Sequence, residues 1–574
     1  MPPTPEDWPT LPVMMLSRAA EWADRPLFRH WQAGAWRSLS WGDFALRVAS
    51  VAAFLRARGI APGDRVLLVS ENRPEFPIAD TAIMAIGAVT VPTYTTNLPG
   101  DHAHILRDSG ARVAIVSTRK LAEKVLEGAA LADGLDLLIC AEDPPSAAGL
   151  AGHHWDEAIN TTGDVAMLAA ETAAAPTDSL ACLIYTSGTG GLPKGVMLPH
   201  RALLANRAGV VPLVKRLGIE NQPYLSFLPL SHSYEHTVGG FLLPSAGLEV
   251  VYSRGADRLS HELAEIKPAV LTAVPRLFEV LRGRILAGLE KETPFKRGLF
   301  DRALALGLRR MDGPRLGLLD RVQDRVLDHL VREKMRARFG GRLKAMVSGG
   351  ARLDPDLSGF FIALGLPVIQ GYGQTEAGPV ISVNLPWANR RHTVGPPLRG
   401  VECRIAEDGE VLVRGDLVMT GYWNKPDATA AALLTLPGED QPWLHTGDVG
   451  VIEDGRLRIT DRKRDFIKTL GGDMVSPAKI ESLLMAEPEV HQALVAGEGK
   501  PALVALIVPT DGMEAKLADA VRRVNAKLPT IERVRHFAAT EAFTIENGLL
   551  TPTMKVKRRA AIEARSAEVE GMYV

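Results

Sequence analysis

A glycine-rich segment with a single lysine carries the residue types that hold phosphate groups. It spans residues 185–195 and reads YTSGTGGLPKG. Glycines let backbone N–H groups approach a phosphate closely, hydroxyls add donors, and the lysine adds a positive charge. A Walker A loop is excluded because that motif has Gly before the Lys and Ser or Thr after it, whereas Pro193 precedes Lys194 and Gly195 follows it here. The residues predicted to contact phosphates are Thr186, Ser187, Gly188, Thr189, Gly191 and Lys194.

Five later stretches also combine small, hydroxyl-bearing and charged residues. Small residues let a flat ring lie against the backbone, and a carboxylate can accept two hydrogen bonds from a ribose diol. A lysine beside an α-phosphate can neutralise charge that builds in a transition state. Each stretch alone is typical of a turn or a solvated surface, so the inference depends on their order in one chain. The stretches are SGGA (348–351), QGYGQTEAG (370–378), WLHTGD (443–448), DRKRDFIKTLGGDMVSP (461–477) and LTPTMKVKRR (550–559).

In this order the stretches resemble the motifs of the adenylate-forming (AMP-binding) superfamily, which includes acyl-CoA synthetases, luciferases and nonribosomal adenylation domains. The resemblance runs from Tyr185 to Arg559 and implies that the chain binds ATP and Mg²⁺. The phosphate loop departs from the usual family form at Gly190, where a second Thr is common, and this removes one hydroxyl. The residues implied to hold the adenine and its surroundings are Gly349, Gly350, Ala351, Gln370, Gly371, Tyr372 and Gly373.

The resemblance also implies roles for individual residues around the nucleotide. Tyr372 stacks on adenine and Thr375 contacts the α-phosphate. Glu376 and Thr189 hold Mg²⁺, an ion that takes oxygen ligands and keeps few of them from protein beside phosphates. Asp448 holds the ribose, and Arg462 lies on the same side of it.

The last two motifs imply a second, mobile part of the site. Lys555 matches the lysine that reaches the site in the first half-reaction, and Lys468 contacts the phosphate or the adenylate. Gly471 and Gly472 let the backbone approach a thiol, which implies coenzyme A as a co-substrate. Arg464 occupies the hinge position, where Asp or Lys is commoner in the family.

The acyl end of the site is indicated by residues 225–234 (LSFLPLSHSY), which resemble the acyl-site stretch of fatty acyl-CoA synthetases. His232 is its catalytic candidate. Residues 272–279, with the helical insertion after them, and residues 470–481 look most like the bacterial long-chain branch. The implied activity converts a fatty acid, preferentially a long-chain one, to acyl-AMP and then to acyl-CoA. Helices around Leu277–Leu286 are expected to line its apolar channel.

Three alternatives stay open beside this interpretation. A fatty acyl-AMP ligase would load a carrier protein instead of free CoA, although the stretch between Thr375 and Asp461 lacks the insertion typical of such enzymes. A synthetase for shorter or aromatic acids would keep the same motifs. A catalytically silent lipid- or nucleotide-binding regulator is disfavoured because Lys194, Glu376 and Lys555 are all retained.

Strands and helices that alternate along the chain must position these motifs. Residues 40–59 show helical spacing after a capping-box signal, residues 66–69 and 113–116 are short apolar runs, and residues 78–87 fit a buried helix between them. This order predicts an α/β fold, with a large N-terminal domain of mostly parallel sheets flanked by helices. Further strands are expected at 248–252, 270–273 and 345–347.

The pattern changes after about residue 400. Residues 409–414 and 455–460 alternate apolar and polar side chains, which predicts a small β-barrel-like subdomain. A strand at 501–508 and a helical stretch at 511–527 predict a smaller α+β domain that moves as a cap. The expected domains are therefore 1–460 (AMP and acyl binding), a hinge at 461–466 and the cap at 467–574.

Composition narrows the class of protein. The 574 residues include 66 Lys or Arg and 67 Asp or Glu, a net charge of −1, which disfavours a nucleic-acid binder. The three cysteines lie far apart in the sequence, and their number and spacing indicate neither a disulfide framework nor a zinc motif. Neither a secretory signal nor an apolar run of about 20 residues is evident. A cytoplasmic location is expected.

One segment breaks the charge balance. Residues 296–344 contain fourteen Lys or Arg and six Asp or Glu, a local net charge of +8, with leucines interleaved at helical spacing. Two interpretations remain: a solvated helical surface, or peripheral contact with an anionic membrane. A homodimer is a further arrangement that the sequence leaves open.

Overall fold

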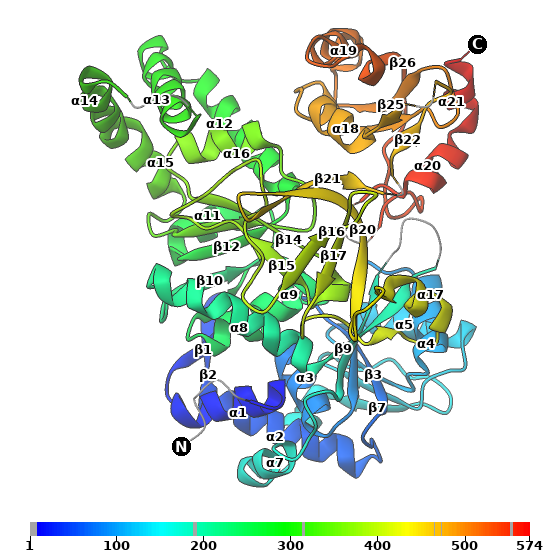
Figure 1. The fold of residues 1–574 in the computed structure, drawn as a ribbon. Helices are drawn as coiled ribbons and strands as arrows, with labels where there is room; N and C mark the ends of the chain where they lie inside the picture. Colours follow the sequence, from blue (N-terminus) through cyan, green and yellow to red (C-terminus); the bar gives the residue numbers. More distant parts are fainter. Residues whose placement is uncertain are drawn as a thin grey trace.

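Two eight-stranded sheets form most of the N-terminal body (Figure 1). The computed structural model describes residues 8–186, 192–312, 316–463, 465–471, 473–551 and 555–573, without the side chain of Asp312. The predicted site residues that lie outside these ranges are Ser187, Gly188, Thr189, Gly191, Arg464 and Gly472.

The first sheet carries the phosphate-loop strands. Its pairs are parallel from β4 to β7, whereas β8 and β9 form an antiparallel hairpin around the glycine-rich segment. The predicted strands at 66–69 and 113–116 are confirmed. In spatial order the strands are β18 (Gly421–Tyr422), β9 (Lys194–Pro199), β8 (Leu180–Thr186), β4 (Val89–Thr93), β3 (Arg65–Val69), β5 (Val113–Val116), β6 (Leu137–Cys140) and β7 (Ala151–His154).

The second sheet carries the stretches that were predicted to form the acyl site and the adenine site. Its central pairs, from β11 to β14, are parallel, so the carboxyl ends of these strands meet at one edge. In spatial order the strands are β15 (Val380–Val383), β14 (Val368–Gly373), β13 (Ala345–Ser348), β12 (Val270–Ala273), β10 (Pro223–Ser226), β11 (Glu249–Tyr252), β1 (Pro26–Gln32) and β2 (Ala35–Ser40).

Helices fill the space between the sheets and cover their outer faces. The predicted helices are confirmed as α2 (Trp41–Ala57), where Ser40 and Asp43 form a capping box, and α3 (Glu75–Ala85). Side chains of α2, α3 and α8 (His200–Leu217) share one core cluster with both sheets. A second cluster packs α12 (Pro275–Glu290) and α16 (Pro355–Ala363) on the far face of the second sheet.

A five-stranded antiparallel sheet follows the body. It contains β16 (Glu402–Ile405), β17 (Glu410–Arg414), β19 (Leu433–Thr435), β20 (Pro442–Glu453) and β21 (Arg456–Arg462). The strands predicted at 409–414 and 455–460 are β17, which is buried at four of its five residues, and β21. Its longest strand, β20, carries Asp448 toward the second sheet.

The described residues from 465 to 573 form a smaller unit, called here the C-terminal unit. Its three-stranded sheet consists of β24 (Val490–Ala496), β25 (Leu503–Pro509) and β26 (Val534–Ala539), with α18 (Pro477–Met485) and α19 (Leu517–Ala526) packed in one core cluster with it. The predicted helix at 511–527 begins later, at Leu517, after a short 3₁₀ turn at Glu514–Lys516. The predicted fold class, a large α/β body with a smaller α+β domain, is confirmed.

An arm projects from the body on the side of α12. It consists of α13 (Pro294–Asp312) and α14 (Leu318–Leu327), and the chain returns through a π-helical turn (Asp328–Arg332) and α15 (Glu333–Arg338). Figure 1 shows α13 and α14 at the upper left, away from the sheets. Among the described residues, no helix is both long and apolar enough to cross a bilayer.

Candidate active site

One large cavity, of about 1390 Å³, opens where the carboxyl ends of β8, β12, β13 and β14 meet. Ligands bind at this edge of open α/β sheets, because the strands end there and loops replace them. Thr186, Gly349, Gly350 and the stretch from Gly371 to Glu376 line it. The antiparallel sheet adds Asp448.

Lys194 and Glu376 are linked across the cavity by a residue that the sequence did not single out, Tyr422. The Nζ of Lys194 lies 3.9 Å from the centre of the Tyr422 ring. The hydroxyl of Tyr422 donates to Oε1 of Glu376 at 2.8 Å. Pairing of β18 with β9 places Tyr422 opposite Val196 and so brings it beside the lysine. No motif marks this tyrosine, because its position depends on that strand pairing.

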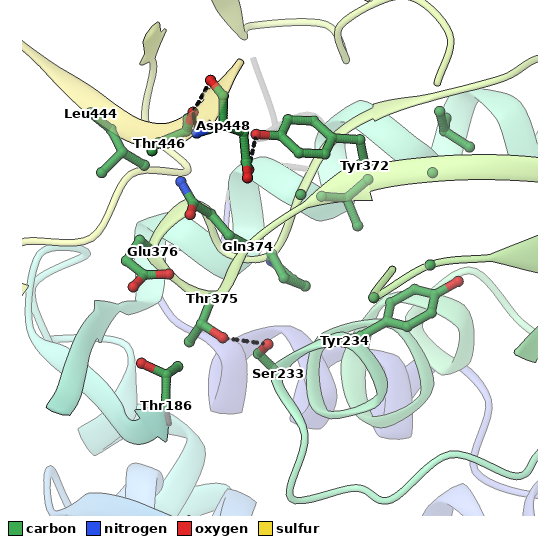
Figure 2. Close-up of a pocket in the computed structure, with 18 of the residues that line it drawn as sticks. Thr186, Ser233, Tyr234, Tyr372, Gln374, Thr375, Glu376, Leu444, Thr446 and Asp448 are labelled. Atoms are coloured by element: carbon green, nitrogen blue, oxygen red, sulfur yellow. Dashed lines mark hydrogen bonds between the residues drawn. The ribbon is translucent and has the colours of Figure 1, made fainter. Parts of the chain in front are cut away.

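Thr375 and His232 meet through a second unpredicted residue, Ser233. The hydroxyls of Thr375 and Ser233 are 2.8 Å apart (Figure 2). His232 caps the short helix α9 (Ser233–Thr237), because its Nδ1 accepts the backbone N–H of Tyr234 at 3.1 Å. Enclosure by the cavity walls, with Lys555 nearby, lowers the pKa of His232 to about 4. The imidazole is therefore neutral near pH 7 and carries its proton on Nε2.

Asp448 is held by groups on three sides. Its Oδ2 accepts the hydroxyl of Tyr372 at 2.6 Å, and its backbone N–H donates to Thr446 Oγ1 at 3.1 Å (Figure 2). Arg462 Nε lies 3.4 Å from Oδ1. Burial raises the pKa of Asp448, and Arg462 and Tyr372 oppose that rise. The contacts fix the Tyr372 ring in place.

Lys555 enters the same cavity from the C-terminal unit. A local pair of bonds shapes its segment, since Thr551 N donates to Lys555 O at 2.8 Å and Lys555 N donates to Thr551 Oγ1 at 3.0 Å. The side chain is surrounded by protein but exposes its surface to the cavity interior. This enclosure, together with Arg462, lowers the pKa of Lys555 to about 8, whereas Asp448 raises it. The ammonium therefore remains mostly charged at pH 7.

Other predicted residues lie away from the cavity surface. Gln370 is buried and donates from Nε2 to the Arg391 carbonyl at 3.1 Å. Ala351 is exposed and does not line the cavity. Lys468 and Gly471 are exposed in the hairpin of β22 (Ile467–Lys468) and β23 (Met474–Val475), which also does not line it. The structure thus brings Lys555 to the nucleotide-side residues but not Lys468 or Gly471.

An apolar lobe continues the same cavity between α8 and the second sheet. The helix that contains Leu277–Leu286, α12, contributes no side chain to the lining of this cavity. Successive residues of a strand point to opposite faces, so Val270 and Thr272 of β12 face the cavity while Leu271 packs with the α12 cluster. The apolar side chains that line this lobe are Val210, Leu213, Val214, Leu217, Ile219, Val238, Leu243, Val270, Val347, Ile369, Val380 and Val383.

Comparison with known proteins agrees with this geometry. Residues 16–423 match the AMP-binding enzyme family, and residues 464–574 match the AMP-binding enzyme C-terminal domain. The chain belongs to the AMP-binding enzyme family.

The relatives of this AMP-binding enzyme include two curated ligases. The long-chain-fatty-acid–CoA ligase FadD15 of Mycobacterium bovis is 34% identical, over 94% of this chain and 93% of that protein. The human long-chain-fatty-acid–CoA ligase 6 is 30% identical, over 88% of this chain and 78% of that protein. Among solved structures, the anthranilate CoA ligase AuaEII bound to anthranoyl-AMP superposes with a TM-score of 0.73 at 22% identity, over 96% of each chain. At that identity the likeness shows the fold.

A buried carboxylate supports the apolar lobe of this AMP-binding enzyme. Glu235, fully buried, accepts hydrogen bonds from Tyr224 at 2.7 Å, Ser226 at 2.6 Å and Thr272 at 3.0 Å. Burial raises its pKa to about 7 despite these three donors. Gly239 is required beside it, because a Cβ there would lie 2.1 Å from Oε1 of Glu235. The network orients Thr272, which lines the lobe.

The cavity also fits a magnesium ion. Glu376 lines it beside Lys194, and its hydrogen bond with Tyr422 restricts the orientation of the carboxylate. One carboxylate near phosphate-binding groups is a typical protein contribution to Mg²⁺, which completes its shell with phosphate oxygens and water.

Proposed function

We propose that this enzyme is a fatty acid–CoA ligase with a preference for long chains, which uses ATP and CoA and forms AMP and pyrophosphate. The observation that carries the proposal is the single cavity in which polar and apolar lobes meet. A nucleotide fits the polar lobe between Lys194, Tyr372 and Asp448, and an aliphatic chain fits the apolar lobe beside α8. The names of the curated relatives support the same substrate class.

In the first step, an oxygen of the fatty acid carboxylate attacks the α-phosphorus of ATP, and the bond to pyrophosphate breaks. Negative charge gathers on the α-phosphate and on the leaving pyrophosphate. Lys555 and Thr375 stabilise the charge at the α-phosphate, and Lys194 stabilises it at the leaving group. Neutral His232, held by the α9 backbone, orients the carboxylate by donating from Nε2.

Asp448 and Glu376 hold the other parts of the nucleotide in this step. Asp448 accepts the ribose hydroxyls, and Tyr372, which it fixes, lies against the adenine. Glu376, with Thr189 outside the described residues, would hold Mg²⁺, which neutralises phosphate charge when bound.

In the second step, the sulfur of CoA attacks the acyl carbonyl carbon, the bond to AMP breaks, and the thiol proton passes to solvent. The exposed hairpin that carries Lys468 and Gly471 must reach the cavity for this step, together with Gly472. Rotation of the C-terminal unit about Arg464, in the predicted hinge at 461–466, would withdraw Lys555 and present the hairpin. Such closures change which residues complete a site.

The decisive experiment is a panel of carboxylic acids from short to very long chains, with aromatic acids included. Each is incubated with ATP, Mg²⁺ and CoA, and both pyrophosphate and acyl-CoA are measured. We expect acyl-CoA from long-chain acids and a maximum of kcat/KM among them. A maximum for short or aromatic acids contradicts the long-chain assignment. If pyrophosphate is released but no acyl-CoA forms, and the acyl group is instead transferred to an added carrier protein, the enzyme is the acyl-AMP ligase alternative. No pyrophosphate release with any acid identifies a silent regulator.

A further inference from the structure

Helix α14 exposes most of its apolar side chains and buries an aspartate, Asp324. The exposed fractions of Leu318, Leu319, Val322, Val326 and Leu330 are 81%, 87%, 66%, 51% and 41%. These five side chains, called here the apolar stripe, recur at spacings of three and four and so share one helix face. An amphipathic helix of a globular body ordinarily buries that face.

A buried ion network fixes this orientation. On the inward side of α14, Asp324 accepts from Arg332 at 2.7 Å and from Arg310 at 3.0 Å. Arg332 is fully buried and also donates to the carbonyls of Ala303 and Ala363. Turning the stripe inward would expel Asp324 and take from the buried Arg332 guanidinium its nearest carboxylate, which is costly. The exposure of the stripe therefore follows from the packing of the arm.

The charge around the stripe is strongly positive. Residues 296–344 carry +8 within a chain of net charge −1, so the remainder carries −9. Arg321 and Arg325 lie on α14 between stripe residues in sequence. Within the described part of the chain neither forms an ion pair with a carboxylate, and Arg321 Nε donates to the Leu316 carbonyl. Their charge is available to an anionic partner.

We infer that the apolar stripe and the arginines beside it form a docking surface for an anionic lipid bilayer. Leucine and valine side chains enter the interface between headgroups and acyl chains, and arginines meet lipid phosphates, as in helices that lie in the membrane plane. A second copy of the arm would place +8 against +8, which disfavours self-association through this face. The arm is a projection rather than a groove (Figure 1), and a projection suits a flat partner. This surface goes beyond the proposed ligase activity and does not depend on it.

The experiment measures binding of the full chain to vesicles by sedimentation. Vesicles of phosphatidylcholine alone are compared with vesicles that contain phosphatidylglycerol, at low and high salt. We expect binding to the anionic vesicles that weakens with salt. Equal binding to neutral vesicles, or no binding to either, overturns the proposal.

Two variants locate the surface. Leu319→Ser with Val322→Ser and Val326→Ser should lower the vesicle partition coefficient at least about tenfold. Arg321→Glu with Arg325→Glu should lower it at least about 30-fold at low salt. The matched controls are Leu46→Ser with Leu131→Ser and Ile531→Ser, similarly exposed, and Lys120→Glu with Arg535→Glu, which changes the net charge equally.

Unchanged vesicle binding in both the serine variant and the glutamate variant overturns the proposal. An equal loss of vesicle binding in the controls also overturns it. Light scattering of the same proteins tests whether a second copy of the chain binds the apolar stripe instead. A wild-type dimer that the serine variant converts to a monomer, with no vesicle binding, would identify the stripe as a self-association surface and overturn the lipid assignment. Because vesicle binding needs no turnover, this result stands apart from the outcome of the carboxylic acid panel.

Discussion

Two segments of the C-terminal unit hold opposite positions relative to the cavity. The segment at Lys555 lines it beside Asp448 and His232. The hairpin at Lys468 and Gly471 is exposed outside it. Under the proposed reaction, each segment serves a different step, and one arrangement of the C-terminal unit can present only one of them. The difference suggests that this arrangement is the one for adenylate formation.

The largest expected effect separates the two segments directly. Lys555→Ala should slow acyl-adenylate formation about 10²- to 10³-fold, because a charge aimed at the α-phosphate is lost. The rate of acyl-CoA formation from preformed acyl-adenylate should stay within about twofold, since Lys555 acts in the first step alone. Pyrophosphate bursts and single-turnover thioester formation measure the two rates.

Arg559→Ala is the matched control for Lys555→Ala, because Arg559 is basic, belongs to the same motif and is exposed outside the cavity. It should leave both rates unchanged. Equal loss of both steps in Lys555→Ala would contradict the division between segments.

The reverse effect is expected for Gly471→Leu. A Cβ at Gly471 meets nothing closer than 3.5 Å, so the variant should fold. Thioester formation from preformed acyl-adenylate should fall about 10²-fold, because the side chain would displace the thiol by an ångström or more. Adenylate formation should persist. Gly571→Leu, in open space on the same unit, is the control, and normal thioester formation in Gly471→Leu would remove the hairpin from the second step.

The two steps should also differ in pH dependence. Lys555 stabilises charge only when protonated, and its pKa is lowered to about 8. The rate of adenylate formation is therefore retained below pH 8 and falls above it, by about tenfold between pH 7 and pH 9. The rate of thioester formation from preformed acyl-adenylate should not show this fall at high pH. In Lys555→Arg the fall in the rate of adenylate formation should shift to higher pH, since guanidinium stays charged. A fall at the same pH as in the wild type would show that another group causes it.

The smallest expected effect concerns one hydrogen bond between the body and the C-terminal unit. Arg276 of α12 lies 3.1 Å from His491 Nδ1 of β24. Arg276→Ala should slow adenylate formation about threefold to tenfold through loss of one hydrogen bond, and it should spare thioester formation. Arg284→Ala, exposed on the same helix, is the control. A larger loss in the second step would indicate that the contact stabilises the other arrangement.

Local patterns sufficed for much of the fold. The capping box at Ser40 is a contact within a few residues, and the apolar runs at β3 and β5 are visible in a short window of sequence because both strands are buried. The predicted phosphate loop could be recognised for the same reason, because its proposed donors come from one segment. The helix predicted at 511–527 begins too early, because a 3₁₀ turn at Glu514–Lys516 precedes α19, as is frequent at helix termini.

Other features depend on pairings far apart in the chain. Tyr422 reaches Glu376 because β18 pairs with β9, and Ser233 reaches Thr375 because two loops meet at one sheet edge. Which face of β12 lines the apolar lobe was not visible in a run of four apolar or small residues. The sequence by itself determined the helices, the strands and the types of reactive groups. Only the tertiary structure decided that Tyr422 joins Lys194 to Glu376 and that the apolar stripe of α14 faces outward, because the first follows from a long-range strand pairing and the second from buried ion pairs.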